Sequence, residues 1–294
     1  MSKGIILAGG SGTRLHPATL AVSKQLLLVY DKPMIHYPLS TLMLSGIREI
    51  LVISTPADTP RFKKALGDGS QWGIRLDYAV QTHPRGLADA FIVGEEFIAG
   101  DPCALALGDN VLYGTEYTRH MQEAAKRNEG ATVYAYQVRD PERYGVVVLS
   151  DDGKPLRLVE KPTDRISDLA ITGIYFYDQN VVSYAKSLRP SKRGELEITD
   201  INNMYLESGN LTVGMLGRGV AWLDTGTFDA LLEAGQFVAT IEKRQGQKIA
   251  CLEEVAYRMD YIGYEELNEL AMAAKDDSYQ AYLLSIAERR ATPR

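Results

Sequence analysis

The sequence is poor in cysteine and histidine, and neither residue type forms a recognisable site. Cys103 and Cys251 are the only cysteines among 294 residues. Such a pair gives neither the disulfide framework of a small secreted domain nor a cysteine-based zinc pattern. The four histidines, at positions 16, 36, 83 and 120, lack metal-ligand spacing. We find no Ser/His/Asp or Cys/His arrangement typical of a covalent nucleophile.

Long apolar runs and excess positive charge are also absent. No segment approaches the roughly 18 apolar residues of a membrane span. The initial apolar run GIILA is too short for the core of a signal peptide. A net charge of −6 and a pI near 5.4 argue against a general surface for nucleic acid or anionic membranes. A small anionic ligand is not excluded, because it needs only a local cluster of cations. From the charge and the lack of a signal peptide or membrane span, we expect a cytoplasmic protein without nucleic-acid or membrane partners.

Short apolar runs alternate with longer segments of helical period, which is typical of an α/β fold. Hydrophobic residues make up 45% of the chain, enough for a full core. Runs such as GIILA and CALAL are apolar at consecutive positions, as in strands covered on both faces. We predict strands at 4–8, 49–54, 76–80, 103–107, 131–138, 144–150, 173–178, 211–216 and 220–223. The predicted helices are 34–46, 59–66, 86–98, 116–128, 179–187, 200–208 and 227–244.

The chain shows no internal repeat and no obvious linker. Charge, Gly and Pro are enriched after residue 139, which indicates an excursion inserted into the main sheet over about 139–200. After residue 245 the pattern becomes helical. We therefore expect a main domain over 1–245 that includes this excursion, and a C-terminal helical segment over 246–294 that packs on it or forms an interface.

A glycine-rich loop follows the first predicted strand. Gly9, Gly10 and Gly12 allow close approach to the main chain, and a turn of this kind directs several N–H groups toward phosphate oxygens. The dinucleotide fingerprint would need glycine where Leu15 stands, and no P-loop can be written. The glycines alone are equally consistent with a structural turn. Arg14 favours an anion site, because a guanidinium can clamp phosphate with two hydrogen bonds.

Three further charged residues stand in a related context. Lys24 follows the loop and precedes the apolar segment LLLVY, although an isolated lysine is usually a solvated surface group. Asp109 and Asp224 each follow a predicted strand, and ligands of open α/β sheets bind at the carboxyl ends of strands. Either aspartate alone is also consistent with a turn or a helix cap. Together with a phosphate loop they predict a Mg²⁺ site, because Mg²⁺ is held by one or two carboxylates plus substrate phosphates.

The segment RYGVVVLSDDGKPLRLVEKP supplies a second cluster, with Tyr144, Gly145, Glu160 and Lys161. A carboxylate that accepts sugar hydroxyls beside a cation that faces phosphate would recognise a sugar phosphate. An exposed Glu–Lys pair would give the same pattern. The segment KRGELEITD adds Arg193, Glu195 and Glu197, with the same two interpretations: ligand contact or solvated turn.

Taken together, these motifs resemble the sugar-nucleotidylyltransferase family, and within it the glucose-1-phosphate thymidylyltransferases. The resemblance covers nearly the whole chain, through GIILAGGSGTRLHP, SKQLL, LGDN, DPERYGVVV, EKP, RGELEITDIN and GRGVAWLDTGT. It implies a Rossmann-like three-layer sandwich of the glycosyltransferase-A-like type, with a mixed, mostly parallel sheet, an inserted sugar-binding lobe and a helical C-terminal tail. It also implies Mg²⁺-dependent, in-line transfer of thymidylyl from dTTP to α-D-glucose 1-phosphate. The products would be dTDP-glucose and pyrophosphate, at the first step of dTDP-rhamnose-type polysaccharide biosynthesis.

The resemblance assigns roles residue by residue. Arg14 and Lys24 would be catalytic, and Mg²⁺ would bind Asp109 and Asp224. Nucleotide contacts would come from Leu7, Gly9, Gly10, Ser11, Gly12, Thr13, Gln25, Gln81, Gly86 and Asp109, with Gln25, Gln81 and the Gly86 backbone around the thymine. Contacts to the sugar phosphate would come from Asn110, Tyr144, Gly145, Glu160, Lys161, Thr172 and Arg193.

Some positions depart from the family pattern. Leu28 replaces a usual proline, Arg85 stands where an acidic residue is more usual, and Thr115 replaces a histidine near the family's regulatory nucleotide site. Feedback by a dTDP-sugar through Arg218, Cys251, Glu254 and Arg258 is therefore a weaker expectation. The family likeness predicts a homotetramer. The alternatives are a uridylyl- or cytidylyltransferase acting on a hexose 1-phosphate, or a non-catalytic nucleotide-sugar sensor.

Overall fold

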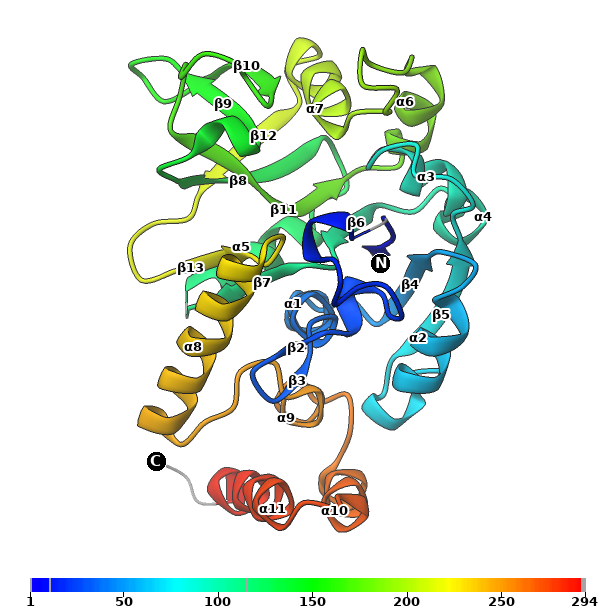
Figure 1. Ribbon diagram of the computed structural model, residues 1–294, viewed down its shortest axis with the longest axis vertical. Helices are drawn as coiled ribbons and strands as arrows, with labels where there is room; N and C mark the ends of the chain where they lie inside the picture. The colour runs from blue at the N-terminus through cyan, green and yellow to red at the C-terminus, as the bar shows by residue number, and fades with distance from the viewer. Residues whose placement is uncertain (1, 11, 115, 292–294) are drawn as a thin grey trace.

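The computed structural model describes residues 2–10, 12–114 and 116–291 and is built around one large twisted sheet (Figure 1). The strand order is β10 (Pro155–Glu160), β9 (Gly145–Leu149), β11 (Leu169–Tyr177), β6 (Cys103–Leu107), β1 (Lys3–Ala8), β4 (Glu49–Ser54) and β5 (Arg75–Val80). β8 (Ala131–Gln137) also pairs with β11, and β12 (Leu211–Met215) pairs with β8. Within the described sheet, β10 and β11 run antiparallel to the other strands. The expected mixed, mostly parallel sheet is confirmed.

Helices cover both faces of this sheet, because its strands are apolar at consecutive positions and side chains alternate between faces. Ile6 and Ala8 of β1 enter one core with α1 (His36–Leu44), α2 (Thr59–Leu66), α5 (Glu116–Ala125) and α9 (Leu252–Arg258). Ile5 and Leu7 enter the opposite core with α3 (Asp89–Val93), α4 (Glu95–Ile98), α6 (Val181–Ser187) and α7 (Ile198–Glu207). The predicted three-layer architecture is confirmed.

Two short ribbons and a long helix flank the sheet. β7 (Asn110–Tyr113) pairs antiparallel with β13 (Ala221–Asp224), and β2 (Leu28–Val29) pairs with β3 (Lys32–Pro33). A third apolar cluster joins both ribbons to α8 (Phe228–Gln245) through Val29, Val111, Ala234 and Val238. The 3-10 turns are Thr13–Leu15, Lys24–Leu26, Ser70–Trp72 and Pro141–Arg143.

The chain after residue 245 is helical, as expected. α9 is followed by α10 (Tyr264–Ala273) and α11 (Asp277–Ala291), and all three helices pack into the core shared with α1. None of the described helices is both long enough and apolar enough to cross a membrane. The division of the chain at residue 245 stays a prediction.

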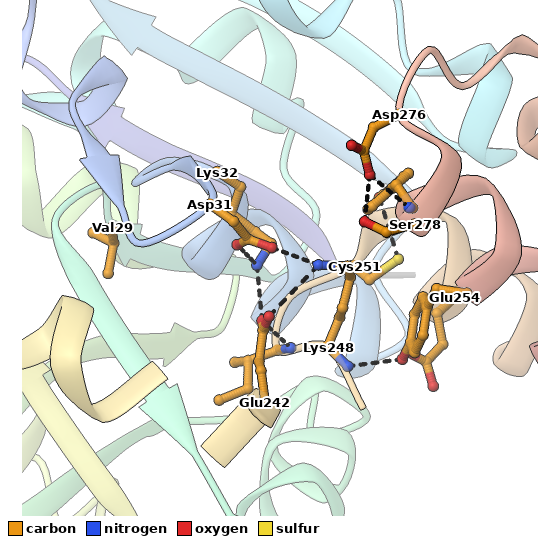
Figure 2. A network of polar contacts seen from close by, with 12 residues as sticks. Val29, Asp31, Lys32, Glu242, Lys248, Cys251, Glu254, Asp276 and Ser278 are labelled. Carbon is orange, nitrogen blue, oxygen red and sulfur yellow. Dashed lines mark hydrogen bonds and ion pairs between the residues drawn. The ribbon is translucent and has the colours of Figure 1, made fainter. Parts of the chain in front are cut away.

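A network of charges, buried in part, connects the β2–β3 ribbon to the C-terminal half (Figure 2). Lys32 pairs with Asp31 and, at 3.0 Å, with Glu242 of α8. Lys248 lies 2.6 Å from Asp31 and 3.6 Å from Glu242. Two cations and two carboxylates therefore neutralise one another where the ribbon, α8 and the tail meet, with Lys32 and Glu242 buried and Asp31 and Lys248 partly open to solvent.

The differences from the predicted elements have local causes. The predicted helix 86–98 is wrong: it is two short helices, α3 and α4, with Gly94 between them. A Cβ at Gly94 would lie 3.0 Å from both the Ala90 carbonyl and the Ile5 side chain, so the close contact with β1 requires glycine. β10 was missed because PLRLVE is half polar, and β2, β3 and β7 were missed because they are short.

Candidate functional site

A cavity of about 310 Å³ opens at the carboxyl ends of β1 and β6. These strands are parallel, with Leu7 opposite Leu107, so the residues that follow them reach the same edge of the sheet. Most of the predicted site residues line this one cavity: Leu7, Gly9, Arg14, Lys24, Gln25, Asp109, Asn110, Tyr144, Gly145, Glu160, Lys161, Arg193 and Asp224. Segments far apart in the sequence thus meet where an α/β sheet normally binds its ligand.

Lys24 and Asp109 form an ion pair inside the cavity. The Lys24 ammonium donates to Asp109 Oδ2, and both side chains are largely buried. The other oxygen of the carboxylate, Oδ1, accepts from Asn110 Nδ2 at 3.1 Å. Asn110 is fixed in turn, because its Oδ1 accepts from the Gly173 N–H and from the Trp222 indole N–H. Asn110 therefore helps to position the Asp109 carboxylate, and the sugar-phosphate contact expected for Asn110 would be additional to this role.

Asp224 reaches Asp109 through strand pairing. Asp224 is the Cα partner of Asn110 in the β7–β13 ribbon, and Thr225 donates to the Asp109 carbonyl from both its N–H (3.1 Å) and its hydroxyl (2.7 Å). Burial raises the pKa of Asp224, and the neighbouring charge of Asp109 raises it further. Arg143, Lys24 and Arg14 oppose this shift. Arg143 makes the direct contact, with Nη2 3.0 Å from Asp224 Oδ2.

The glycine-rich loop borders a second cavity of about 200 Å³, which shares Arg14 and Lys24 with the first. Its other lining residues are Gly10, Gly12, Thr13, Leu15 and Gly226. Gly226 allows the Arg14 guanidinium to lie near Asp224: a Cβ there would be 2.9 Å from Arg14 Nη2 and 3.1 Å from Asp224 Oδ1. A cavity walled by glycine backbone, arginine and lysine suits a phosphate-bearing ligand.

Glu160, the last residue of β10, also lines the larger cavity. Its Oε2 accepts from the Thr199 hydroxyl at 2.6 Å, and its Oε1 lies 3.7 Å from both Lys161 Nζ and Arg193 Nη1. Gly145 makes room for this arrangement, because a Cβ there would be 2.9 Å from Thr199 Oγ1 and 3.0 Å from Glu160 Oε2. A carboxylate and two cations therefore stand together, as recognition of a sugar phosphate requires.

Three of the predicted residues that the structure describes line neither of these two cavities. Gln81 lies behind Gly9, with its Nε2 donating to the buried Asp89 at 2.9 Å. Gly86 packs against the Leu196 backbone, where a Cβ would be only 2.4 Å from the carbonyl oxygen. Thr172 is fully buried, and its hydroxyl has no hydrogen-bond partner in the described protein. Its flanking residues Ile171 and Gly173 face the cavity instead, because side chains alternate along β11.

Sequence reasoning missed several residues of the cavity wall. The most informative is Arg143, which pairs with both Asp140 and Asp224 and lies over the Tyr144 ring. Trp222 packs against Tyr144, with ring centroids 5.1 Å apart, and closes the same side. Arginine next to the predicted Tyr144 was the available signal. The remaining unpredicted lining residues are Leu87, Leu107, Ile171, Gly173, Tyr175, Ile198, Thr199 and Asn202.

The two aspartates fit a metal that substrate completes. Among the described residues, no group of three or more His, Cys, Asp or Glu side chains is arranged to hold a metal ion. Asp109 and Asp224 are a pair of neighbouring, largely buried carboxylates that line the larger cavity. This donor set suits Mg²⁺, which commonly takes one or two carboxylates and fills its other positions with water and phosphate oxygens.

Other predicted positions lie elsewhere. Ser11 and Thr115 fall outside the described residues. Cys251 and Glu254 are buried on and beside α9, and Arg258 pairs with Glu254 at 2.7 Å. Arg218 is exposed in the loop between β12 and β13. No contact described here joins Arg218 to the α9 group, so a regulatory site stays a prediction.

The family model described as nucleotidyl transferase matches residues 3–241. The chain belongs to the nucleotidyl transferase family. The glucose-1-phosphate thymidylyltransferase of Neisseria meningitidis is 56% identical over 98% of this chain and 100% of that relative.

Solved structures agree with this nucleotidyl transferase assignment. A Bacillus anthracis structure described as a glucose-1-phosphate thymidylyltransferase, in complex with a sucrose, superposes with a TM-score of 0.75 at 40% identity and covers 81% of this chain and 95% of that one. A UDP-glucose pyrophosphorylase complexed with UDP-glucose has a TM-score of 0.71 and covers 83% of this chain and 100% of that one. Its identity is 23%, so it shows the common fold alone.

Proposed function

We propose that this nucleotidyl transferase joins dTTP and α-D-glucose 1-phosphate to form dTDP-glucose and pyrophosphate. The main observation in support is that one cavity is lined by two groups of residues. Arg14 and Lys24 suit the phosphates of a nucleotide, and Glu160 and Arg193 suit a sugar phosphate. A full-length relative named for this reaction supports the choice of substrates.

The reaction needs little covalent chemistry from the protein. A phosphate oxygen of glucose 1-phosphate forms a bond to the α-phosphorus of dTTP, the bond from that phosphorus to the bridging oxygen breaks, and pyrophosphate leaves with the electron pair. Such transfers depend on positioning and on stabilisation of developing charge. Arg14 and the loop amides hold the departing phosphates, and Lys24 supplies positive charge at the reacting ones.

Asp109 and Asp224 are the residues that would hold Mg²⁺. When bound, this ion supplies positive charge to the phosphate oxygens as the leaving group departs. The chain prepares these two ligands before any substrate arrives: Asn110 orients the Asp109 carboxylate and Thr225 fixes its backbone.

The residues around Glu160 select the sugar phosphate. Glu160 accepts hydroxyls of the glucose ring, and the Thr199 hydroxyl holds one of its oxygens in place. Lys161 and Arg193 contact the phosphate of glucose 1-phosphate. Tyr144 and Trp222 form an apolar wall for the ring and exclude water from that side.

The choice of base is the least constrained part of the proposal. Gln25 lines the cavity, with Nε2 3.3 Å from the Gly9 carbonyl, whereas Gln81 and Gly86 lie behind its wall. A uridylyl- or cytidylyltransferase would use the same phosphate and sugar contacts. A non-catalytic sensor is disfavoured because Arg14, Lys24, Asp109 and Asp224 are all present and converge on one cavity.

Pyrophosphate release with glucose 1-phosphate and Mg²⁺, measured separately with dTTP, UTP, CTP and ATP, tests the proposal. It predicts the highest kcat/KM with dTTP and loss of activity when EDTA removes Mg²⁺. A higher kcat/KM with UTP or CTP would select the uridylyl or cytidylyl alternative. No release with any of the four would favour the sensor.

We also propose the assembly, location and pathway in which the reaction takes place. A homotetramer in the cytoplasm, where dTTP is available, would supply dTDP-glucose for dTDP-rhamnose-type polysaccharide synthesis. A domain over 1–245 with the tail 246–294 at an interface agrees with the span of the family match, residues 3–241.

A further inference from the structure

Arg143 is a cation of the cavity wall that makes ion pairs with two carboxylates, one from each terminal nitrogen of its guanidinium. Its Nη1 lies 2.7 Å from Asp140 Oδ2 and its Nη2 lies 3.0 Å from Asp224 Oδ2. The guanidinium also lies over the Tyr144 ring, 5.3 Å from the centroid. Three contacts therefore hold it at the edge of the cavity.

The two contacts with carboxylates differ in environment. The Asp140 side chain is 42% exposed, whereas the Asp224 side chain is 14% exposed and has the Asp109 carboxylate as a neighbour. A buried carboxylate beside another carboxylate needs a compensating positive charge. Arg143 supplies that charge to Asp224, just as Lys24 supplies it to Asp109. Each of the two aspartates thus already has a cation.

We infer that Arg143 is the counterion which Asp224 gives up when a divalent cation binds, and that the released guanidinium end then contacts substrate phosphate. A divalent cation on Asp224 Oδ2 would lie close to the positive charge of Arg143 Nη2, 3.0 Å from the same oxygen, and the repulsion between the two charges drives this end of the guanidinium away. Asp140 keeps the displaced guanidinium at the cavity wall through Nη1. The inference rests on the proposed metal role of Asp109 and Asp224.

This exchange makes metal binding depend on substrate. Without nucleotide, Arg143 competes with the metal and lowers its affinity. With nucleotide present, phosphate oxygens accept the hydrogen bonds that Arg143 loses, so displacement no longer leaves its Nη2 without a partner. The active site then takes its metal together with the nucleotide.

Binding of Mn²⁺ alone, followed by electron paramagnetic resonance without nucleotide, tests the counterion role. Arg143→Met approximates the length of the side chain and removes its charge, and we expect it to bind Mn²⁺ at least about 10-fold more tightly than the unchanged protein, because a positive charge close to the metal is removed. Arg143→Lys keeps one charge but reaches only one carboxylate, so we expect an intermediate affinity. Arg165→Met removes an exposed arginine paired with Asp168 and should leave Mn²⁺ binding unchanged.

The expected gain in affinity separates this role from a structural one, because loss of folding would weaken Mn²⁺ binding. Equal or weaker binding by Arg143→Met, in protein whose circular dichroism matches that of the unchanged protein, would overturn the inference. Retention of full Mn²⁺ affinity by Asp224→Asn would overturn it as well, together with the metal assignment. Failure of the unchanged protein to make dTDP-glucose would refute the proposed function, while the Mn²⁺ comparison would still decide the role of Arg143.

Calorimetry with dTTP at saturating Mg²⁺, without glucose 1-phosphate, tests the contact with phosphate. We expect Arg143→Met to bind dTTP about 10-fold more weakly, the scale of one lost hydrogen bond to a charged group. Unchanged dTTP affinity would overturn the phosphate contact and leave only the counterion role.

Discussion

Asp109 lies beside Asp224 because Asn110, which follows Asp109 in the sequence, is the strand partner of Asp224. Asn110 pairs with Asp224 in the β7–β13 ribbon, and Thr225 donates twice to the Asp109 carbonyl. Residues separated by more than 100 positions are thus brought together by backbone pairing, which fixes their distance independently of any metal or substrate. This part of the cavity is therefore preorganised.

Lys24 should contribute mainly to the rate. Lys24→Met removes the cation that pairs with Asp109, and we expect kcat to fall by about 100- to 1,000-fold, the usual effect of losing one charge contact in a transition state. Pyrophosphate release measures this loss. Lys154→Met, which removes an exposed lysine paired with Asp152, serves as the control and should keep full activity. A drop in kcat of less than about 10-fold would contradict the role given to Lys24.

Gly145 should be required for sugar-phosphate binding. Gly145→Ala would place a Cβ within 3.0 Å of both Thr199 Oγ1 and Glu160 Oε2, so the Glu160 carboxylate must move. We expect the KM for glucose 1-phosphate to rise while the KM for dTTP stays constant. Gly217→Ala is the matched control, since nothing lies within 4 Å of the position of its Cβ. Unchanged kinetics in Gly145→Ala would show that the Glu160 geometry does not matter.

Glu160 itself should act on sugar-phosphate binding alone. Glu160→Gln keeps the shape and the contact with Thr199 but removes the charge that faces Lys161 and Arg193. We expect the KM for glucose 1-phosphate to rise about 10-fold or more, because hydrogen bonds to a charged acceptor are lost. Steady-state kinetics with each substrate varied in turn measures this. An equal rise in both KM values would argue against a specific sugar contact.

Glu242 should stabilise the fold rather than the reaction. Glu242→Gln removes one carboxylate from the buried Lys32 and the nearby Lys248 but leaves both paired with Asp31, and we expect the free energy of unfolding to fall by about 1–3 kcal/mol. Urea denaturation measures the change. Glu233→Gln alters an exposed glutamate of the same helix and should change it by less than about 0.5 kcal/mol. Equal effects of the two substitutions would show that the network in Figure 2 adds no specific stability.

The sequence predicts those parts of the fold that depend on local pattern. The apolar runs at 4–8, 49–54 and 103–107 are strands of the central sheet, because residues buried on both faces leave a continuous apolar signal. The split of 86–98 into α3 and α4 could not be predicted from local pattern, because Gly94 is required by its contact with Ile5 of β1.

In the candidate site too, some residues could be predicted from local sequence, whereas others are brought in only by the fold. Arg14, Lys24, Asp109 and Asp224 could be singled out because each follows a strand or a glycine-rich loop. The sequence offers only the position of Arg143 beside Tyr144 as a signal; its pairing with Asp224, 81 residues away, is visible only in the folded chain. The alternation of side chains along β11 likewise turns Thr172 away from the cavity, which residue types alone do not reveal.

Competition among nucleotides tests the central claim most directly. The protein is incubated with glucose 1-phosphate, Mg²⁺ and equal concentrations of dTTP, UTP, CTP and ATP, and the nucleotide sugars formed are separated and identified by mass. We predict that dTDP-glucose is the main product and that Asp109→Asn and Asp224→Asn nearly abolish it. A main product with another base, or no nucleotide sugar at all, would contradict the proposed function.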